Sequence, residues 1–158
     1  MNKILYLLTT FIFLNQEIRA SEPYLGILRS VDSNSQQKFS HNMYFFTCRS
    51  YGIVSIDELY AISKKDTTCF NAIKQFYRQN PSLKYYSMGI LKQSQKYHLE
   101  FKNNRCIIYA KGTKSLSELL LLQGLGIVKA GFNDDEFNYS FNEAQAEAVE
   151  EKMPSRTL

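Results

Sequence analysis

The residues with the clearest chemical potential in this sequence are its cysteines and histidines. The 158-residue chain has three cysteines and two histidines, which are Cys48, Cys69, Cys106, His41 and His98. Such side chains bind zinc when they stand at short, regular spacings such as Cys-x-x-Cys. No such spacing occurs here, and no local pattern pairs a cysteine with a histidine as a thiol nucleophile requires. The sequence therefore predicts neither a zinc site nor cysteine catalysis.

The odd number of cysteines instead favours one disulfide and a third thiol that is buried or pairs with another chain, provided that the chain is exported to an oxidising compartment. The sequence leaves the pairing open. A bond between Cys48 and Cys69, for example, would close a ring of about 20 residues and stabilise the fold by roughly 3 kcal/mol in the chain-entropy model.

The first residues predict this export. Lys3 precedes the apolar run 4–14, and the small residue Ala20 follows, which is the pattern of a signal peptide that occupies residues 1–20. The run is shorter than the roughly 20 apolar residues that span a bilayer, so we expect no transmembrane span in the mature chain. We expect a periplasmic, outer-envelope or extracellular location. The alternative is an uncleaved anchor, because two charged residues shortly precede Ala20.

Residues 21–158 are long enough for one domain with its own core, and no internal repeat or low-complexity tract divides them. The formal net charge of the whole chain is +4 at pH 7. This mild excess permits contact with nucleic acid but does not predict it, because dedicated binders concentrate basic residues on one face.

The elements that would position any site begin with β-strands. We predict a strand over 24–31, a polar turn over 32–37, a strand that starts near Phe39 and continues through Cys48, and a further strand that leads from Arg49 into a loop or short helix by Glu58. The aromatic run Tyr44–Phe46 is expected in the core, because aromatic side chains on strands most often pack inward.

Helical and hairpin signals follow. Asp66 opens an amphipathic helix that ends at Asn80. A further strand is predicted over 84–91. The segments 96–101 and 105–110 form a hairpin through two asparagines, a residue that tolerates positive φ.

Two capping boxes predict the last helices. Ser115 with Glu118 opens a helix that closes at Gly124, and Ser140 with Glu143 opens a second helix. The acidic stretch 134–136 between them is expected to be a solvated loop.

This C-terminal part resembles a known family. A strand that ends in Tyr109 to Gly112, the helix pattern of Leu116 to Leu125, and the Glu-Ala-Gln-Ala pattern within Asn142 to Lys152 resemble the C-terminal half of staphylococcal-nuclease-like (thermonuclease) domains. The resemblance extends weakly over most of residues 24–152. It implies an α+β fold, namely a five-stranded Greek-key OB-fold barrel with about three helices.

The resemblance also implies a chemistry. Members of the family cleave phosphodiesters with a calcium ion held by carboxylates, a carboxylate that acts on the attacking water, and two arginines that neutralise the phosphate. The first arginine corresponds to Arg49, and the catalytic glutamate corresponds to Asp57, with Glu58 as an adjacent candidate. The second arginine falls on Asn103, and Arg105 lies two residues further on the same strand face. The alternative interpretation of Arg105 is a solvated strand residue.

The calcium ligands of the family are poorly represented. One ligand position corresponds to Asn34, which keeps an oxygen but lacks the charge, and another corresponds to Val54, which cannot coordinate a cation. Only Asn34 and Asp57 remain as weak metal-ligand candidates, and calcium affinity depends on ligand charge.

Three functional hypotheses result. The first is an exported, non-catalytic nuclease-like OB-fold that needs no cofactor and binds or scaffolds other envelope proteins, for example in a secretion or conjugation apparatus. The second is a calcium-dependent secreted nuclease that uses Arg49, Asp57 or Glu58, and Arg105. The third is a nucleic-acid-binding OB-fold without cleavage activity.

Overall fold

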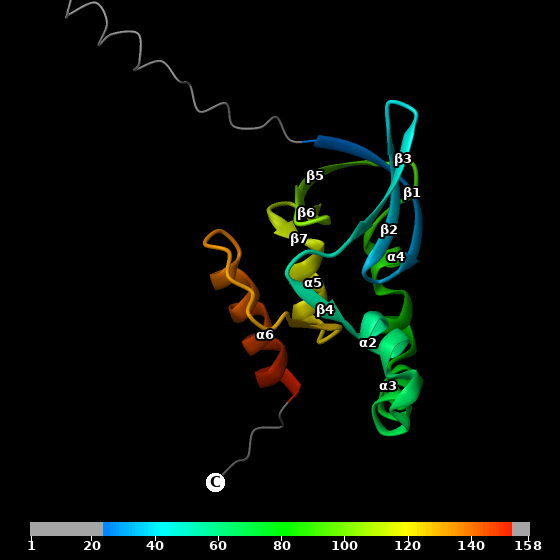
Figure 1. Cartoon of the computed structure of the whole chain (residues 1–158), viewed down its shortest axis with the longest axis vertical. Coiled ribbons are helices and arrows are strands. Elements are labelled where there is room, and N and C mark those ends of the chain that lie inside the picture. The colour runs from blue at the N-terminus through cyan, green and yellow to red at the C-terminus, as the bar shows by residue number, and fades with distance from the viewer. Residues whose placement is uncertain (1–23, 153–158) are drawn as a thin grey trace, which may run out of the picture.

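The computed structural model of the protein describes residues 24–152. The predicted signal peptide over residues 1–20 lies outside these residues and stays a prediction. The fold is α+β, as expected, and its main element is an antiparallel sheet with the strand order β3-β2-β1-β5-β6-β7 (Figure 1). These strands are β1 (Tyr24–Ser33), β2 (Gln36–His41), β3 (Tyr44–Arg49), β5 (Lys96–Lys102), β6 (Arg105–Lys111) and β7 (Lys114–Ser115).

Helices and a second, two-stranded sheet complete the molecule. In Figure 1, α2 and α3 form a helical lobe at one end of the sheet, and α6 lies on the other side of the molecule next to α5. The remaining elements are β4 (Ile53–Ser55), α2 (Ile56–Ile62), η1 (Ser63–Lys65), α3 (Thr67–Gln79), η2 (Pro81–Tyr85), α4 (Tyr86–Ile90), α5 (Leu116–Leu122), β8 (Gly126–Val128) and α6 (Asn138–Lys152), with β4 paired to β8.

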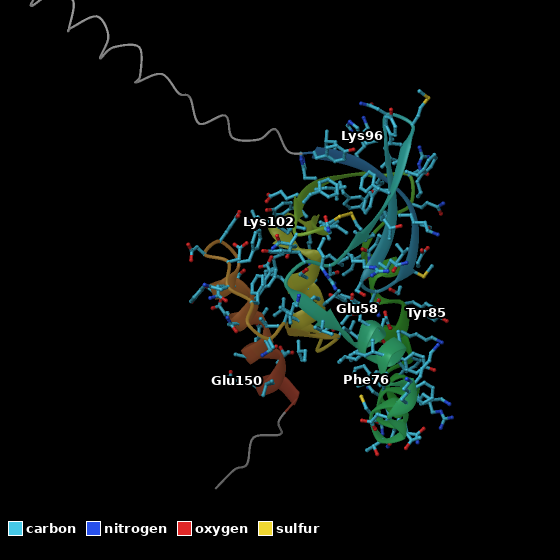
Figure 2. All side chains as sticks on the ribbon, in the orientation of Figure 1. Glu58, Phe76, Tyr85, Lys96, Lys102 and Glu150 are labelled. Atoms are coloured by element: carbon cyan, nitrogen blue, oxygen red, sulfur yellow. A yellow bond between two sulfur atoms is a disulfide. The ribbon has the colours of Figure 1, made fainter. Side chains whose placement is uncertain are left out.

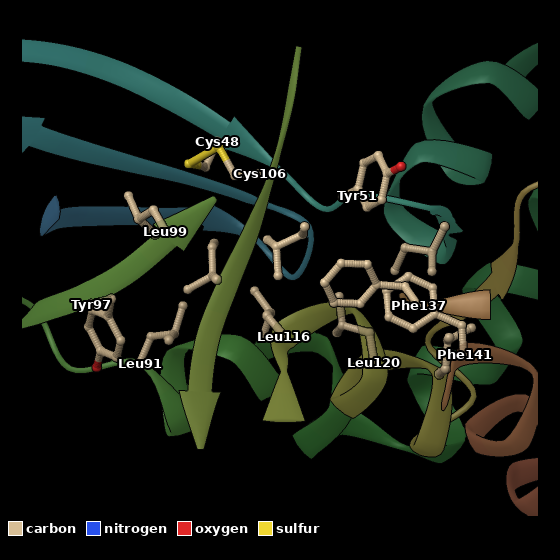
Figure 3. Close-up of a cluster of buried hydrophobic side chains, with 14 of the residues drawn as sticks. Cys48, Tyr51, Leu91, Tyr97, Leu99, Cys106, Leu116, Leu120, Phe137 and Phe141 are labelled. Atoms are coloured by element: carbon tan, nitrogen blue, oxygen red, sulfur yellow. A yellow bond between two sulfur atoms is a disulfide. The ribbon is translucent and has the colours of Figure 1, made fainter. Parts of the chain in front are cut away.

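The sheet curves until β3 approaches β6. A disulfide joins Cys48 to Cys106, Ser50 forms a parallel bridge with Cys106, and the backbone N–H of Tyr51 donates to the carbonyl of Cys106 over 3.1 Å (Figure 3). The prediction of one disulfide is confirmed, and Cys69 is a free, half-buried thiol. Because the contact is confined to one end of β3, the sheet is not a closed barrel.

The core lies between the concave face of the sheet and the helices that follow it. Phe39, Ile107, Leu120 and Phe141 are all fully buried in it. Figure 3 shows Leu120 and Phe141 in this cluster. Burial of a side chain of this size contributes about 1.5–3 kcal/mol. Gly52 is required here, because its φ is +74° and a Cβ would lie 2.6 Å from the ring of Phe141.

Several local predictions are confirmed. Ser115 and Glu118 form a capping box, in which the Ser115 Oγ accepts from the Glu118 N–H over 3.2 Å and Glu118 accepts from the Ser115 N–H over 2.7 Å. The hairpin between β5 and β6 turns through Asn103 and Asn104, whose φ values are 51° and 59°. Asp66 caps α3, which ends before Asn80 as expected.

Other predictions are wrong. The strand expected from Phe39 to Cys48 is two strands, which meet in a turn at Asn42 and Met43, both with positive φ. The segment 84–91 is helical rather than extended. Ser140 does not cap α6, because the helix already starts at Asn138, whose N–H bonds to the carbonyl of Asp134. The described residues contain five α-helices rather than about three, and the main sheet has six strands rather than five.

Two further corrections concern exposure. Tyr44 and Phe45 do not lie in the core but are 78% and 74% exposed, because the end of the β2–β3 hairpin extends beyond it. Asp134 is not fully solvated, since its carboxylate accepts from the Tyr51 hydroxyl over 2.8 Å and pairs with Lys102 over 3.2 Å.

Candidate functional site

A cleft of about 520 Å³ lies where the turn after β1, the end of β3, the start of α2 and the start of β6 meet. The four residues predicted for catalysis, Arg49, Asp57, Glu58 and Arg105, all line it, together with Val54. The structure thus brings together side chains that are up to 56 positions apart, from Arg49 to Arg105. The other charged lining residues are Asp32 and Lys129.

A second capping box holds the acidic side of the cleft. The Oγ of Ser55 accepts from the Glu58 N–H over 3.1 Å, and Glu58 Oε2 accepts from the Ser55 N–H over 3.3 Å. The buried hydroxyl of Ser55 also donates to the Ser35 hydroxyl over 2.7 Å. These bonds fix the first turn of α2, and with it Asp57 and Glu58, against the turn between β1 and β2. The sequence contains this box, but our predictions did not use it.

Glu58 forms an ion pair with Arg105. Its Oε1 lies 2.9 Å from Arg105 Nη1, which also donates to the carbonyl of Ser50 over 3.1 Å. Their side chains are 25% and 28% exposed. Arg105 is therefore not a solvated strand residue, and both oxygens of Glu58 are occupied by partners within the chain.

Asp57 is occupied in the same way. Its Oδ1 accepts from the Tyr77 hydroxyl over 2.7 Å, and its Oδ2 accepts from the backbone N–H of Asn34 over 2.9 Å. Burial and this hydrogen bond to a carboxylate raise the pKa of Tyr77 well above its ordinary value of 10, so the phenol keeps its proton. Sequence reasoning missed Tyr77, because its place on the amphipathic face of α3 indicated only core packing.

Asn34 does not offer its side chain to the cleft. Its Nδ2 donates to the carbonyl of Leu83 over 2.9 Å, and its Oδ1 accepts from the Ser87 N–H over 2.9 Å. The buried amide thereby fixes the helical segment 81–90 against the turn between β1 and β2. Both ends of the Asn34 amide thus bond to that segment, and its assignment as a metal ligand stays a prediction.

The remaining charged residues of the cleft make weaker contacts. Arg49 is exposed, and its Nε donates to Gln36 Oε1 over 3.3 Å. Asp32 pairs with Lys38 over 3.1 Å at the surface. Within residues 24–152, Arg49 makes no ion pair with a carboxylate, so its charge is available at the cleft mouth.

The cleft does not fit a calcium ion. Three acidic and three basic side chains line it, so its formal charge is balanced, whereas calcium sites gather several anionic oxygens around the ion. Val54 offers only hydrocarbon, and each carboxylate oxygen of Asp57 and Glu58 already accepts a hydrogen bond from within the chain. Among the described residues, no three His, Cys, Asp or Glu side chains group in a way that suits a metal.

Comparison with known proteins adds no family. No model of a known protein family matches the chain, and no curated protein matches it either. The resemblance to staphylococcal-nuclease-like domains therefore stays a prediction. In the part of the chain that the structure describes, no helix combines the length and apolar character needed to cross a membrane.

Proposed function

We propose that this protein is a non-catalytic, staphylococcal-nuclease-like OB-fold module that is exported and binds another protein of the cell envelope. A secretion or conjugation apparatus is one setting that suits such a module. The strand arrangement supports the fold assignment. β1 pairs with both β2 and β5, and β3 approaches β6 in the parallel sense, which agrees with a partly open Greek-key barrel.

The state of the cleft supports the absence of catalysis. Metal-dependent phosphodiester cleavage requires carboxylate oxygens that are directed at a cation, and a cationic group that is free to meet the phosphate. Here Asp57 and Glu58 serve as internal hydrogen-bond acceptors, and Arg105 is neutralised by Glu58. Asp57, Glu58 and Arg105 thus join the sheet to the helical lobe, whereas Arg49 keeps a charge without an ion pair at the mouth of the cleft.

The free edge of β3 carries the binding part of the proposal. β3 is the last strand of the sheet, and within the described residues Tyr44–Thr47 pair only with β2. Natural proteins protect such edges against pairing with other chains by lysine, proline or a β-bulge. Residues 44–47 contain no lysine and no proline, and they pair with β2 without a register shift, so they form no bulge. Met43, Tyr44 and Phe45 next to this edge are 93%, 78% and 74% exposed.

The occupant that fits this edge is an extended strand of a partner protein with apolar side chains. Main-chain hydrogen bonds to 44–47 would supply affinity, and contacts with Tyr44 and Phe45 would supply specificity, as in other cases of strand addition. No acidic residue flanks these positions on β3, and Arg49 at the end of the strand favours an acidic residue near one end of the partner segment.

The test is purification of the mature chain, with its partners, from its native envelope. We expect Phe45→Lys to reduce recovery of the partner at least about tenfold, because it places a charge in the proposed apolar contact. A tenfold change corresponds to about 1.4 kcal/mol of binding free energy. Ile62→Lys is the matched control, since Ile62 is 73% exposed and lies on α2. Retention of the partner by Phe45→Lys, or recovery of the chain without any stoichiometric partner, would contradict the proposal. So would self-association that Phe45→Lys abolishes, because the occupant would then be a second copy.

A second candidate function is a secreted nuclease. The observation in its favour is that Arg49, Asp57, Glu58 and Arg105 lie in one cleft. Its test is incubation of the mature protein with plasmid DNA and with RNA, in calcium or in a chelator. Cleavage that the chelator suppresses and that Arg49→Ala abolishes would establish this candidate, and stable substrates under all conditions would reject it.

A further inference from the structure

The helical lobe contains a second cavity, which we call the lobe pocket. It has a volume of about 330 Å³ and lies between α2, α3 and η2. Its lining residues are Asp57, Tyr60, Lys74, Tyr77, Arg78 and Lys84. Asp57 is the only residue that it shares with the cleft described above.

Three basic side chains converge on the lobe pocket from two elements. Lys74 and Arg78 are four residues apart on α3 and therefore lie on the same helix face. The turn at Asn80 and Pro81 then reverses the chain, so that Lys84 on η2 also borders the lobe pocket. Figure 2 shows Tyr85, the neighbour of Lys84, on this lobe.

No acidic group neutralises these cations. Within residues 24–152, Lys74, Arg78 and Lys84 form no ion pair. Lys74 lies 5.4 Å from the ring centre of Phe70, and Lys84 lies 5.5 Å from that of Tyr85. Such contacts with aromatic rings restrain an ammonium group and leave its charge in place.

The one carboxylate of the lobe pocket already has two partners. Asp57 accepts from Tyr77 and from the backbone of Asn34. The formal charge of the lining is therefore +2, from three cations and one anion. Arginine and lysine side chains are the donors that bind phosphate groups in proteins.

We propose that the lobe pocket binds a phosphate monoester carried on a small organic group. The dianion of a phosphate monoester balances the charge of +2, and Lys74, Arg78 and Lys84 supply donors for its oxygens. The rings of Tyr60 and Tyr77 line the remaining wall and suit the organic part. The volume is at the lower end of the range of about 300–1,000 Å³ for small-ligand sites. The inference does not rest on the proposed function, because it uses a different surface.

The test uses phenyl phosphate as the probe and calorimetry or NMR as the readout. We expect saturable binding by the wild-type protein and no binding of phenol, which lacks the phosphate. The triple variant K74Q/R78Q/K84Q should bind at least about tenfold more weakly, since tenfold corresponds to about 1.4 kcal/mol. The control is K64Q/K65Q/K92Q, which removes three exposed cations outside the lobe pocket, two on η1 and one after α4, and should change affinity less than about twofold. The thermal unfolding of both variants checks that they are folded.

A second arm distinguishes a soluble ligand from a lipid headgroup. It measures sedimentation of the protein with vesicles of phosphatidylcholine, with and without phosphatidic acid, whose headgroup is a phosphate monoester. Binding to phosphatidic acid that the pocket variant alone loses would assign the site to a lipid, and binding of phenyl phosphate alone would assign it to a soluble ester. Equal weakening in both triple variants would overturn the proposal, and so would a lack of saturable binding to both phenyl phosphate and phosphatidic acid.

Discussion

At the scale of single residues, three carboxylates of this protein act as hydrogen-bond acceptors between distant parts of the chain. Asp57 accepts a hydrogen bond from the Tyr77 hydroxyl, and Glu58 accepts one from Arg105. Asp134 accepts hydrogen bonds from both Tyr51 and Lys102. A hydrogen bond to a charged group contributes about 1.5–3 kcal/mol, which is more than a neutral bond does. These acids therefore fix the positions of separate parts of the chain.

Asp134 gives the clearest dependence on pH. Burial by itself would raise its pKa, but the hydrogen bond from Tyr51 and the Lys102 ammonium outweigh this effect and lower the pKa below its ordinary value of 3.8. The stability that Asp134 contributes is therefore complete above pH 3.8 and is lost as the pH falls through the lower, folded-state pKa. Lys102 has a raised pKa despite its burial, because Glu136 and Asp134 favour its charged form, so its own contribution is lost only in alkali.

We predict that Asp134→Asn lowers the free energy of unfolding by about 1–3 kcal/mol near neutral pH. Its stability should also fall less than that of the wild type between about pH 4 and about pH 2, because the titrating group is gone. Urea unfolding followed by circular dichroism at several pH values measures both effects. Asp135→Asn is the control, since Asp135 is exposed and its side chain makes no hydrogen bond or ion pair within the described residues. An identical acid profile for wild type and Asp134→Asn would refute this account.

At the scale of elements, β3 has two different halves. Its first half carries exposed aromatic side chains on a free edge, and its end is tied to β6 by the disulfide between Cys48 and Cys106. The disulfide holds this end of the strand in place, so the edge would present a constant shape to the partner that we propose. This restraint reduces the entropy that binding must overcome.

Removal of the disulfide should destabilise the fold. The two cysteines are 58 positions apart, and closure of a loop of this length stabilises the fold by roughly 4 kcal/mol in the chain-entropy model. We predict a loss of that order for the double variant C48S/C106S, measured by urea unfolding without reductant. Cys69→Ser should change stability by less than about 1 kcal/mol, because Cys69 is a half-buried thiol outside the core. A similar effect of both changes would mean that the bridge does not form.

At the scale of the whole molecule, the helical lobe and the sheet meet at the cleft through polar contacts. Asp57, Glu58 and Asn34 each bind across this boundary, so the cleft is a structural joint. Figure 2 shows Glu58 at the sheet side of the lobe. The opposite charges within the cleft cancel, which removes the electrostatic attraction for a divalent cation.

We therefore predict that calcium leaves the stability of the molecule unchanged. A ligand at 100 times its dissociation constant stabilises a folded protein by about 2.7 kcal/mol, which raises the unfolding temperature by several degrees in a domain of this size. The unfolding temperature in about 1 mM calcium should equal that in chelator at matched ionic strength, within about 1 °C. A saturable rise that Asp57→Asn removes would contradict this prediction and would favour the nuclease.

Local features were predictable because their causes lie within a few residues. The capping box of Ser115 and Glu118, the asparagine turn after β5, and the start of α3 at Asp66 each depend on neighbouring residues in the chain. The resemblance also selected four residues that do share one cleft. The prediction of a strand over 84–91 was wrong, because the helical conformation of this segment depends on the amide of Asn34, more than 45 positions away.

By itself, the sequence determined the α+β class, the presence of one disulfide, and the residue types at the cleft. Only the tertiary structure decided that Cys48 pairs with Cys106, that Glu58 neutralises Arg105, and that Tyr44 and Phe45 face solvent. The physical reason is that capping and turns depend on short-range contacts, whereas pairing and exposure depend on which distant surfaces pack against each other. Acidic and basic side chains of the same types can form either a metal site or a set of internal ion pairs and hydrogen bonds, and the packing of distant surfaces decides which.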